Sequence, residues 1–86
     1  MTTLNVLTAA RALLADHWTS ACPRHNIEEY CIITATSAAA LGEEFYQPAI
    51  RVLVELAPMP LTKFNATHTQ TDVLALFDRA IASVQA

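Results

Sequence analysis

Cysteine and histidine are the residues of this 86-residue chain whose types and spacing could do chemistry. Cys22, His25 and Cys31 follow one another as Cys-x₂-His-x₅-Cys, and His17 precedes them. Two thiolates and two imidazoles make a donor set that zinc accepts. The spacing differs from a standard zinc finger, and no Cys-x₂-Cys knuckle accompanies it. We therefore expect free thiols, with Cys31 buried and Cys22 in a loop; a zinc site on Cys22, His25 and Cys31 and a Cys22–Cys31 disulfide are the alternatives.

The same side chains could form a nucleophilic Cys/His pair, but catalysis needs further groups. No motif marks an oxyanion hole or an acid that would orient the base. The adjacent carboxylates Glu28-Glu29 and Glu43-Glu44 lie near expected helix N-termini, where negative charge offsets the helix dipole. We expect no enzymatic activity and no cofactor.

Composition and charge exclude several classes of partner. The net charge is −3, and the five basic residues are scattered, so the chain lacks the basic stripe that nucleic-acid binding requires. The longest uncharged stretch, Tyr30 to Gly42, has thirteen residues, whereas a membrane span needs about 20. The N-terminus Met-Thr-Thr-Leu-Asn does not resemble a signal peptide. We expect a single domain, residues 1–86, located in the cytoplasm, with no membrane or nucleic-acid contact.

Apolar residues recur at spacings of three and four, which predicts helices. The chain has one glycine and no Asn-Gly or Asp-Gly hairpin turn. The expected helices are about 4–18 (capped by Thr2 or Thr3), 27–41, 44–57 and 70–84. Four amphipathic helices with short connections predict an all-α fold, a compact four-helix domain that is orthogonal or bundle-like.

The second helix begins in a segment whose residues also suit a strand. Tyr30 to Thr34 is β-branched enough for a strand, so residues 30–36 are either helix or strand. An Asn26 cap with Glu29 three residues later, and Gly42 as the left-handed C-terminal residue, favour helix.

Elsewhere local signals place the ends of helices. Pro48 would restrict the regular part of the third helix to Tyr46 or Gln47 onward. Residues 59–68 are expected to be irregular, with Asn65 and His68 in turns. Thr69 and Asp72 form a capping-box-like pair before the last helix. His17 is expected at the rim of the core.

The third helix has more apolar surface than one core contact needs. Ile50, Leu53, Val54 and Ala57 share one face, and Val52 and Leu56 widen the apolar arc to about 200°. Phe45 and Tyr46 follow the Gly42 turn, where an aromatic side chain suits an interface. We therefore expect a non-enzymatic protein-interaction module that binds another protein or itself, as a homodimer. The expected contact residues are Val52, Leu56, Phe45 and Tyr46.

Short motifs along the chain resemble those of a known family. Trp18 ends the first helix, Cys22 lies in a loop, Cys31 opens an Ala-rich helix, Phe64-Asn65 forms an aromatic-Asn pair, and 71–80 reads TDVLALFDRA. The chain resembles a small domain-of-unknown-function family of actinobacteria and their phages, which has a Trp-Asn-Asp turn. Phe64, Ala66 and Thr34 depart from that family, standing where it has Trp, Asp and Gly. The resemblance implies a helical fold and a phage or actinobacterial origin, and no activity.

Overall fold

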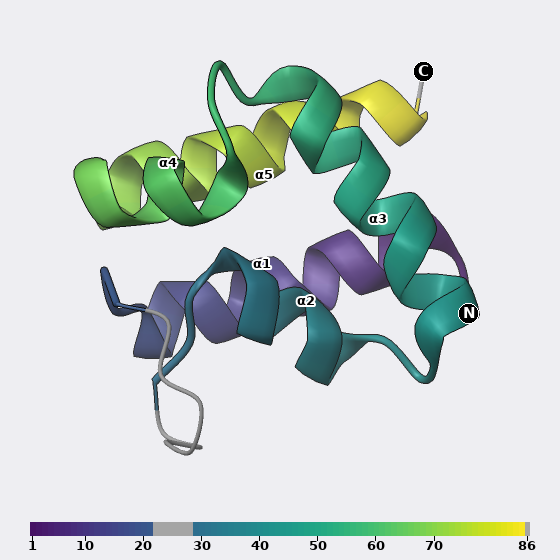
Figure 1. The fold of residues 1–86 in the computed structure, drawn as a ribbon. Helices are drawn as coiled ribbons and strands as arrows, with labels where there is room; N and C mark the ends of the chain where they lie inside the picture. Colours follow the sequence, from purple (N-terminus) through teal and green to yellow (C-terminus); the bar gives the residue numbers. More distant parts are fainter. Residues whose placement is uncertain (22–28, 86) are drawn as a thin grey trace.

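The fold is all-α, as expected, but the described residues form five helices in place of four. The computed structural model describes residues 1–21 and 29–85. Its helices are α1 (Thr3–His17), α2 (Ile32–Ala39), α3 (Glu43–Leu56), α4 (Leu61–Thr67) and α5 (Gln70–Gln85). No strand occurs within these ranges, and the body measures 30 × 26 × 20 Å. Figure 1 shows α1 and α2 along one side, α4 and α5 along the other, and α3 crossing at one end.

Helix α1 is central to the core. Its residues Val6, Leu7, Ala10 and Leu14 are fully buried at helical spacing, and α1 contacts α2, α3 and α5. Thr2 caps the helix, as predicted, because its Oγ1 accepts a hydrogen bond from the Asn5 N–H at 3.1 Å.

Helix α2 begins later than the sequence predicts. Ile32 is its first residue and Cys31 its N-cap, where the Cys31 N–H donates to Thr34 Oγ1 at 2.9 Å. The predicted cap, Asn26, lies outside the described residues, and Glu29 lies before the helix rather than in its first turn. Tyr30 instead forms a β-bridge with Trp18. In the segment 30–36, Tyr30 and Cys31 are therefore extended, and the helix begins at Ile32.

Gly42 serves a different helix from the one predicted. Helix α2 ends at Ala39 with Ala40 as its C-cap, whereas Gly42 is the N-cap of α3. Its φ of 144° is a conformation that residues with a side chain rarely adopt. The turn between α2 and α3 therefore requires glycine.

Helix α3 runs through its proline. It begins at Glu43, with Glu43 and Glu44 in its first turn as expected, so Pro48 lies inside the helix rather than beside its start. Pro48 is exposed, and Glu44, the residue whose carbonyl would accept its missing N–H, is exposed as well. Water can therefore satisfy the carbonyl that Pro48 leaves without a helical partner.

Residues 59–68, expected to be irregular, contain α4. Leu61, Phe64 and Asn65 form its buried face, and Pro60 precedes it. Thr62, Asn65 and Thr67 have low helix propensity, so packing rather than local preference holds this short helix.

Helix α5 begins where the sequence predicts. The Thr69 N–H donates to Asp72 Oδ2 and the Asp72 N–H donates to Thr69 Oγ1, both at 3.2 Å, which confirms the capping box. Val73, Leu76, Phe77 and Ala80 of α5 are fully buried in the core.

Candidate functional site

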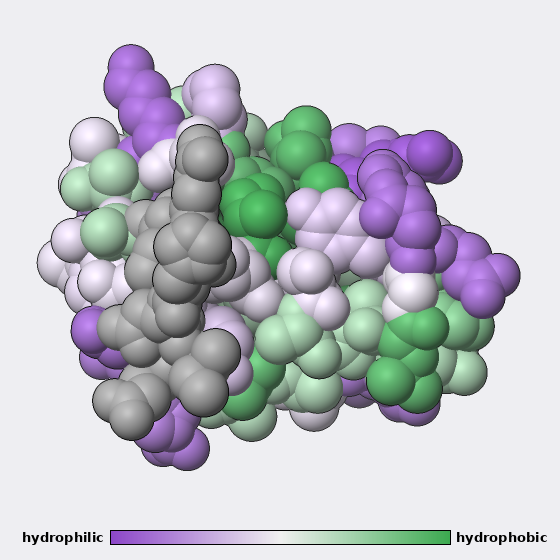
Figure 2. Space-filling view, turned by 60° about the horizontal axis from the view of Figure 1, so that its bottom comes forward, coloured by the Kyte–Doolittle hydropathy of each residue, from purple (hydrophilic) through white to green (hydrophobic). Residues whose placement is uncertain are grey.

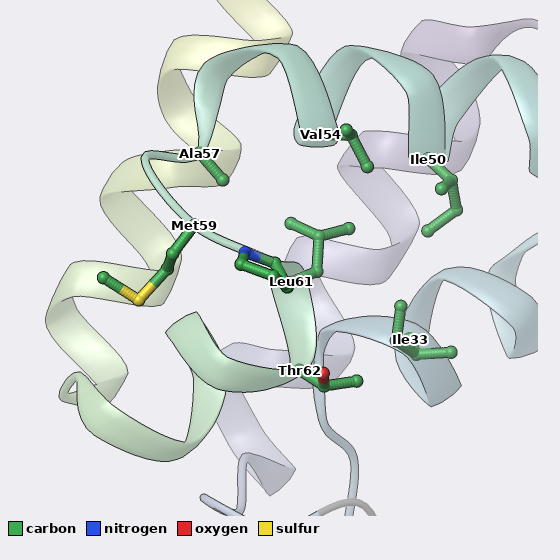
Figure 3. A pocket seen from close by; sticks show the side chains of 8 residues that line it. Ile33, Ile50, Val54, Ala57, Met59, Leu61 and Thr62 are labelled. Carbon is green, nitrogen blue, oxygen red and sulfur yellow. The ribbon is translucent and has the colours of Figure 1, made fainter.

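An apolar groove lies between α2, α3 and α4 (Figure 3). Its volume is about 480 Å³. The residues that line it are Ile33, Ile50, Val54, Ala57, Met59, Pro60, Leu61 and Thr62. Figure 3 shows side chains from the three helices and from the α3–α4 connection around one space. We refer to this feature as the groove.

The lining of the groove suits binding better than catalysis. Thr62 supplies its hydroxyl, and every other lining side chain is apolar. No charged or nucleophilic side chain lines it, so general acid–base chemistry has no group there. Burying a polar group against such a wall without a partner costs free energy. The groove therefore favours apolar side chains over polar ligands.

Val54 marks where α3 leaves apolar surface uncovered. The shared face of α3 is divided, because Leu53 is fully buried whereas Val54 is 55% exposed. Among the described residues, the other exposed large hydrophobic side chains are Met1 and Leu41. The sequence placed the surplus apolar surface of α3 at Val52 and Leu56 and counted Val54 with the core face, whereas the exposed large apolar side chain of α3 is Val54.

The four residues expected to contact a partner lie elsewhere on α3. Val52, Leu56 and Phe45 are half-buried and pack against the core. Tyr46 is half-buried, and burial, reinforced by Glu43 and then Cys31, raises its pKa above the ordinary 10.0. None of the four lines the groove, and their role in binding stays a prediction.

Asn65 is the most highly connected polar side chain near the groove. Its Oδ1 accepts hydrogen bonds from Trp18 Nε1 at 3.0 Å and from the Ile32 N–H at 3.1 Å. Its Nδ2 donates to the carbonyls of Thr19 and Ser20, at 2.9 and 3.0 Å. Asn65 is fully buried, so it uses both amide hydrogens and accepts two bonds in the protein interior. It joins α4 to the end of α1 and the start of α2.

Sequence reasoning placed Asn65 in a turn, and the structure corrects this. Leu61, Phe64, Asn65 and His68 have the i, i+3, i+4, i+7 spacing of one helix face. That pattern was the available signal, but the two prolines before it, Pro58 and Pro60, made the segment resemble a loop. His68 follows the helix, where its ring stacks on Phe64 with centroids 4.0 Å apart.

Some of the candidate zinc ligands lie within the described residues and some lie outside them. Cys22 and His25 lie outside the described residues. Cys31 is a buried free thiol whose Sγ accepts from Thr34 Oγ1 at 3.6 Å, and His17 is exposed rather than at the core rim. Within residues 1–21 and 29–85, no three potential ligands form a group that could hold a metal. The zinc hypothesis therefore stays a prediction.

Hydrophobic surface is present on the outside of the molecule. Figure 2 shows hydrophobic side chains gathered in the upper middle of one face, with hydrophilic side chains to one side of them.

In the part of the chain that the structure describes, no helix has the length and apolar character required to cross a membrane.

Comparison with known proteins yields one match. The model of a family described as "Family of unknown function (DUF6197)" matches residues 1–83. No curated protein and no solved structure matches the chain. The match supports a small uncharacterised domain family, as the sequence motifs indicated.

Proposed function

The chain belongs to DUF6197, a family of unknown function, and we propose that it is a non-enzymatic protein-interaction module whose contact site is the groove. The groove carries this proposal because it is open, apolar and close to 480 Å³ in volume. Sites that bind apolar groups are typically hollows of about 300–1,000 Å³. Val54, at 55% exposure, offers apolar surface for a partner to cover.

The chemistry of the groove indicates what the partner presents. With one hydroxyl and no charge in its lining, the groove rewards contact with aliphatic or aromatic side chains. An amphipathic helix places such side chains at i, i+3 and i+4, which suits a groove between helices. We propose that the partner inserts two or three apolar side chains of one helix.

A different protein suits the groove better than a second copy of this chain. Stable interfaces bury about 800 Å² on each partner. The exposed large hydrophobic residues of the described chain are Met1, Leu41 and Val54, which belong to separate segments. Of the three, only Val54 lies in a helix, so the described chain presents no helix with two or more exposed large apolar side chains for the groove of a second copy. We further propose, from the resemblance alone, that the chain is phage-encoded and acts on a host protein in the host cytoplasm; homodimerisation is the alternative.

Two matched variants test the groove as the contact site. Val54→Lys places a charge at the groove, and Leu41→Lys places the same charge on a side chain that is 76% exposed and outside it. Both side chains are exposed, so both variants should fold. A protein captured from an actinobacterial host lysate is then purified, and its affinity for each variant is measured by calorimetry.

The proposal expects tight binding by the wild type and Leu41→Lys, and at least about tenfold weaker binding by Val54→Lys, since an unpaired charge would be buried at the contact. Equal affinities for the two variants would refute the groove as the site. Light scattering on the wild type tests the alternative, because a dimer that Val54→Lys dissociates would identify a second copy as the occupant.

A further inference from the structure

We infer that Asn65 is the positioning residue of the groove: its one carboxamide holds the α4 wall against the first turn of α2. The inference rests on the proposed function in taking the groove as the binding site. It concerns how the groove acquires its shape, which the lining residues do not explain by themselves.

The hydrogen bonds of Asn65 connect α4 and α2, the helices that form two walls of the groove. Leu61 and Thr62, in the first turn of α4, line the groove, and Ile33 lines it from α2. Asn65 lies one turn beyond Leu61, and its Oδ1 accepts from the backbone N–H of Ile32, the residue next to Ile33. One hydrogen bond of 3.1 Å thus links the backbone beside one wall to the helix that forms the other.

Helix α4 has little else to fix its direction. It has seven residues, and a helix of this length is not stable by itself in water. Apolar contacts by Leu61 and Phe64 hold α4 to the core but are not directional. The four hydrogen bonds of Asn65 have fixed geometry, so they determine how α4 is oriented.

The same side chain also helps to hold the residues after α1 beside the residues before α2. The Tyr30 N–H donates to the His17 carbonyl, and the Thr19 N–H donates to the Tyr30 carbonyl at 2.9 Å. The Thr19 carbonyl then accepts from Asn65 Nδ2. Trp18, the single tryptophan of the chain, donates its indole N–H to Asn65 Oδ1. The Trp18 indole is therefore a built-in reporter of this arrangement.

The test compares Asn65→Ala with Gln70→Ala by NMR in the full chain. Gln70 is a matched control because its Nε2 also donates to two carbonyls at the end of α1, those of Leu14 and Ala15, at 2.8 and 3.0 Å. Gln70 belongs to α5 and does not line the groove. Methyl NOEs between α2 and α4 report the groove walls, and NOEs between α1 and α5 report the rest of the core.

We expect Asn65→Ala to lose α2–α4 NOEs and shift the Ile33 and Leu61 methyl signals while its α1–α5 NOEs persist. Gln70→Ala should keep both sets. Retention of all α2–α4 NOEs and methyl shifts in Asn65→Ala would refute the inference. No partner is present in this experiment, so its failure is distinguishable from failure of the proposed function.

A second measurement on the wild type applies if Asn65→Ala does not fold. The Trp18 indole N–H and the Ile32 N–H donate to the same oxygen of α4, so one opening event should expose both. Hydrogen exchange should give them equal protection within about threefold and slow their exchange at least about tenfold. Protection that differs by more than about tenfold between them would overturn the shared role of Asn65.

Discussion

Replacing Asn65 by alanine should remove most of the stability of this domain. The change deletes four hydrogen bonds at once, and the side chain is fully buried. The free-energy cost is not equal for its four hydrogen-bond partners, because they differ in their access to water. The expected cost therefore follows from which partner remains buried without a hydrogen bond.

The magnitude is dominated by the two N–H groups that donate to Asn65 Oδ1. The Ile32 N–H is in the core and the Trp18 indole is half-buried, and a buried donor without a partner costs about 1–3 kcal/mol. The carbonyls of Thr19 and Ser20 lie at or near the surface, where water replaces Nδ2 at a cost of about 0.5 kcal/mol each. Taking about 1–2 kcal/mol for the buried Ile32 N–H, about 1 kcal/mol for the half-buried Trp18 indole and about 1 kcal/mol for the two carbonyls together gives about 3–4 kcal/mol. The total stability of so small a domain is about 5 kcal/mol.

Urea denaturation measures this loss. For a slope of about 1 kcal/mol per molar urea, the midpoint should fall by about 3 M. Trp18 is at the perturbed site, so helical circular dichroism should be recorded beside its fluorescence. Gln70→Ala, which removes two hydrogen bonds to the end of α1, should cost about 1 kcal/mol. A cost for Asn65→Ala no larger than that of Gln70→Ala would refute the account of Asn65 as a buried hub.

Other substitutions probe the helix ends and the ionisable groups. Gly42→Ala should cost about 1 kcal/mol in thermal or urea unfolding because of its φ of 144°, although the nearest atom a Cβ would meet is Glu44 Oε1 at 4.0 Å; an unchanged midpoint would contradict this. Pro48→Ala should stabilise the domain by about 1–2 kcal/mol in the same assay by restoring a helical N–H within α3, and a loss of stability would show that the proline is needed. In an ultraviolet titration, Tyr46 should ionise above its ordinary pKa of 10.0, and Tyr46→Phe should remove that phase. Because the folded-state pKa is the higher one, the contribution of Tyr46 to stability is complete below pH 10.0 and is lost as pH rises through the folded pKa. Metal analysis of untagged protein should find no zinc, and a chelator should leave Tm unchanged; one bound zinc per chain would instead support the Cys-His site.

The long helices could be predicted from the sequence, because local signals suffice for them. Thr2 caps α1 and the Thr69–Asp72 box opens α5, each through bonds between residues close in sequence. The buried stripes of these helices repeat over about two turns within helices of 15 and 16 residues, so the helical period is clear. The all-α class follows from the same pattern.

The short elements were predicted less well. Helix α2 has eight residues and α4 has seven, so each shows the helical spacing only once, and nearby β-branched residues or prolines outweighed it. Gly42 was assigned to the end of α2 and in fact caps α3. A glycine between two helices suits either role, and which helix it serves depends on where α2 ends, a boundary that packing sets.

The chemistry that the sequence suggested and the site that the structure presents are different. Cysteine and histidine spacing gave a zinc site as an alternative to free thiols, whereas the described residues present an apolar groove beside a buried amide. Groove residues Ile33 and Leu61 are 28 positions apart in sequence, and nothing in their local surroundings predicts that they meet. The interaction role was inferred from apolar surplus on α3, and the location of that surplus required the fold.

By itself the sequence determined the helical class, the caps of α1 and α5 and the excess of apolar residues on α3, because each depends on residues within a few positions of one another. Only the tertiary structure decided that α4 is a helix, that Asn65 is a buried hub and that the groove exists. The physical reason is that Asn65 bonds to residues 33 and 45 to 47 positions away. Contacts at such separations depend on how the helices pack, and local sequence patterns carry no record of them.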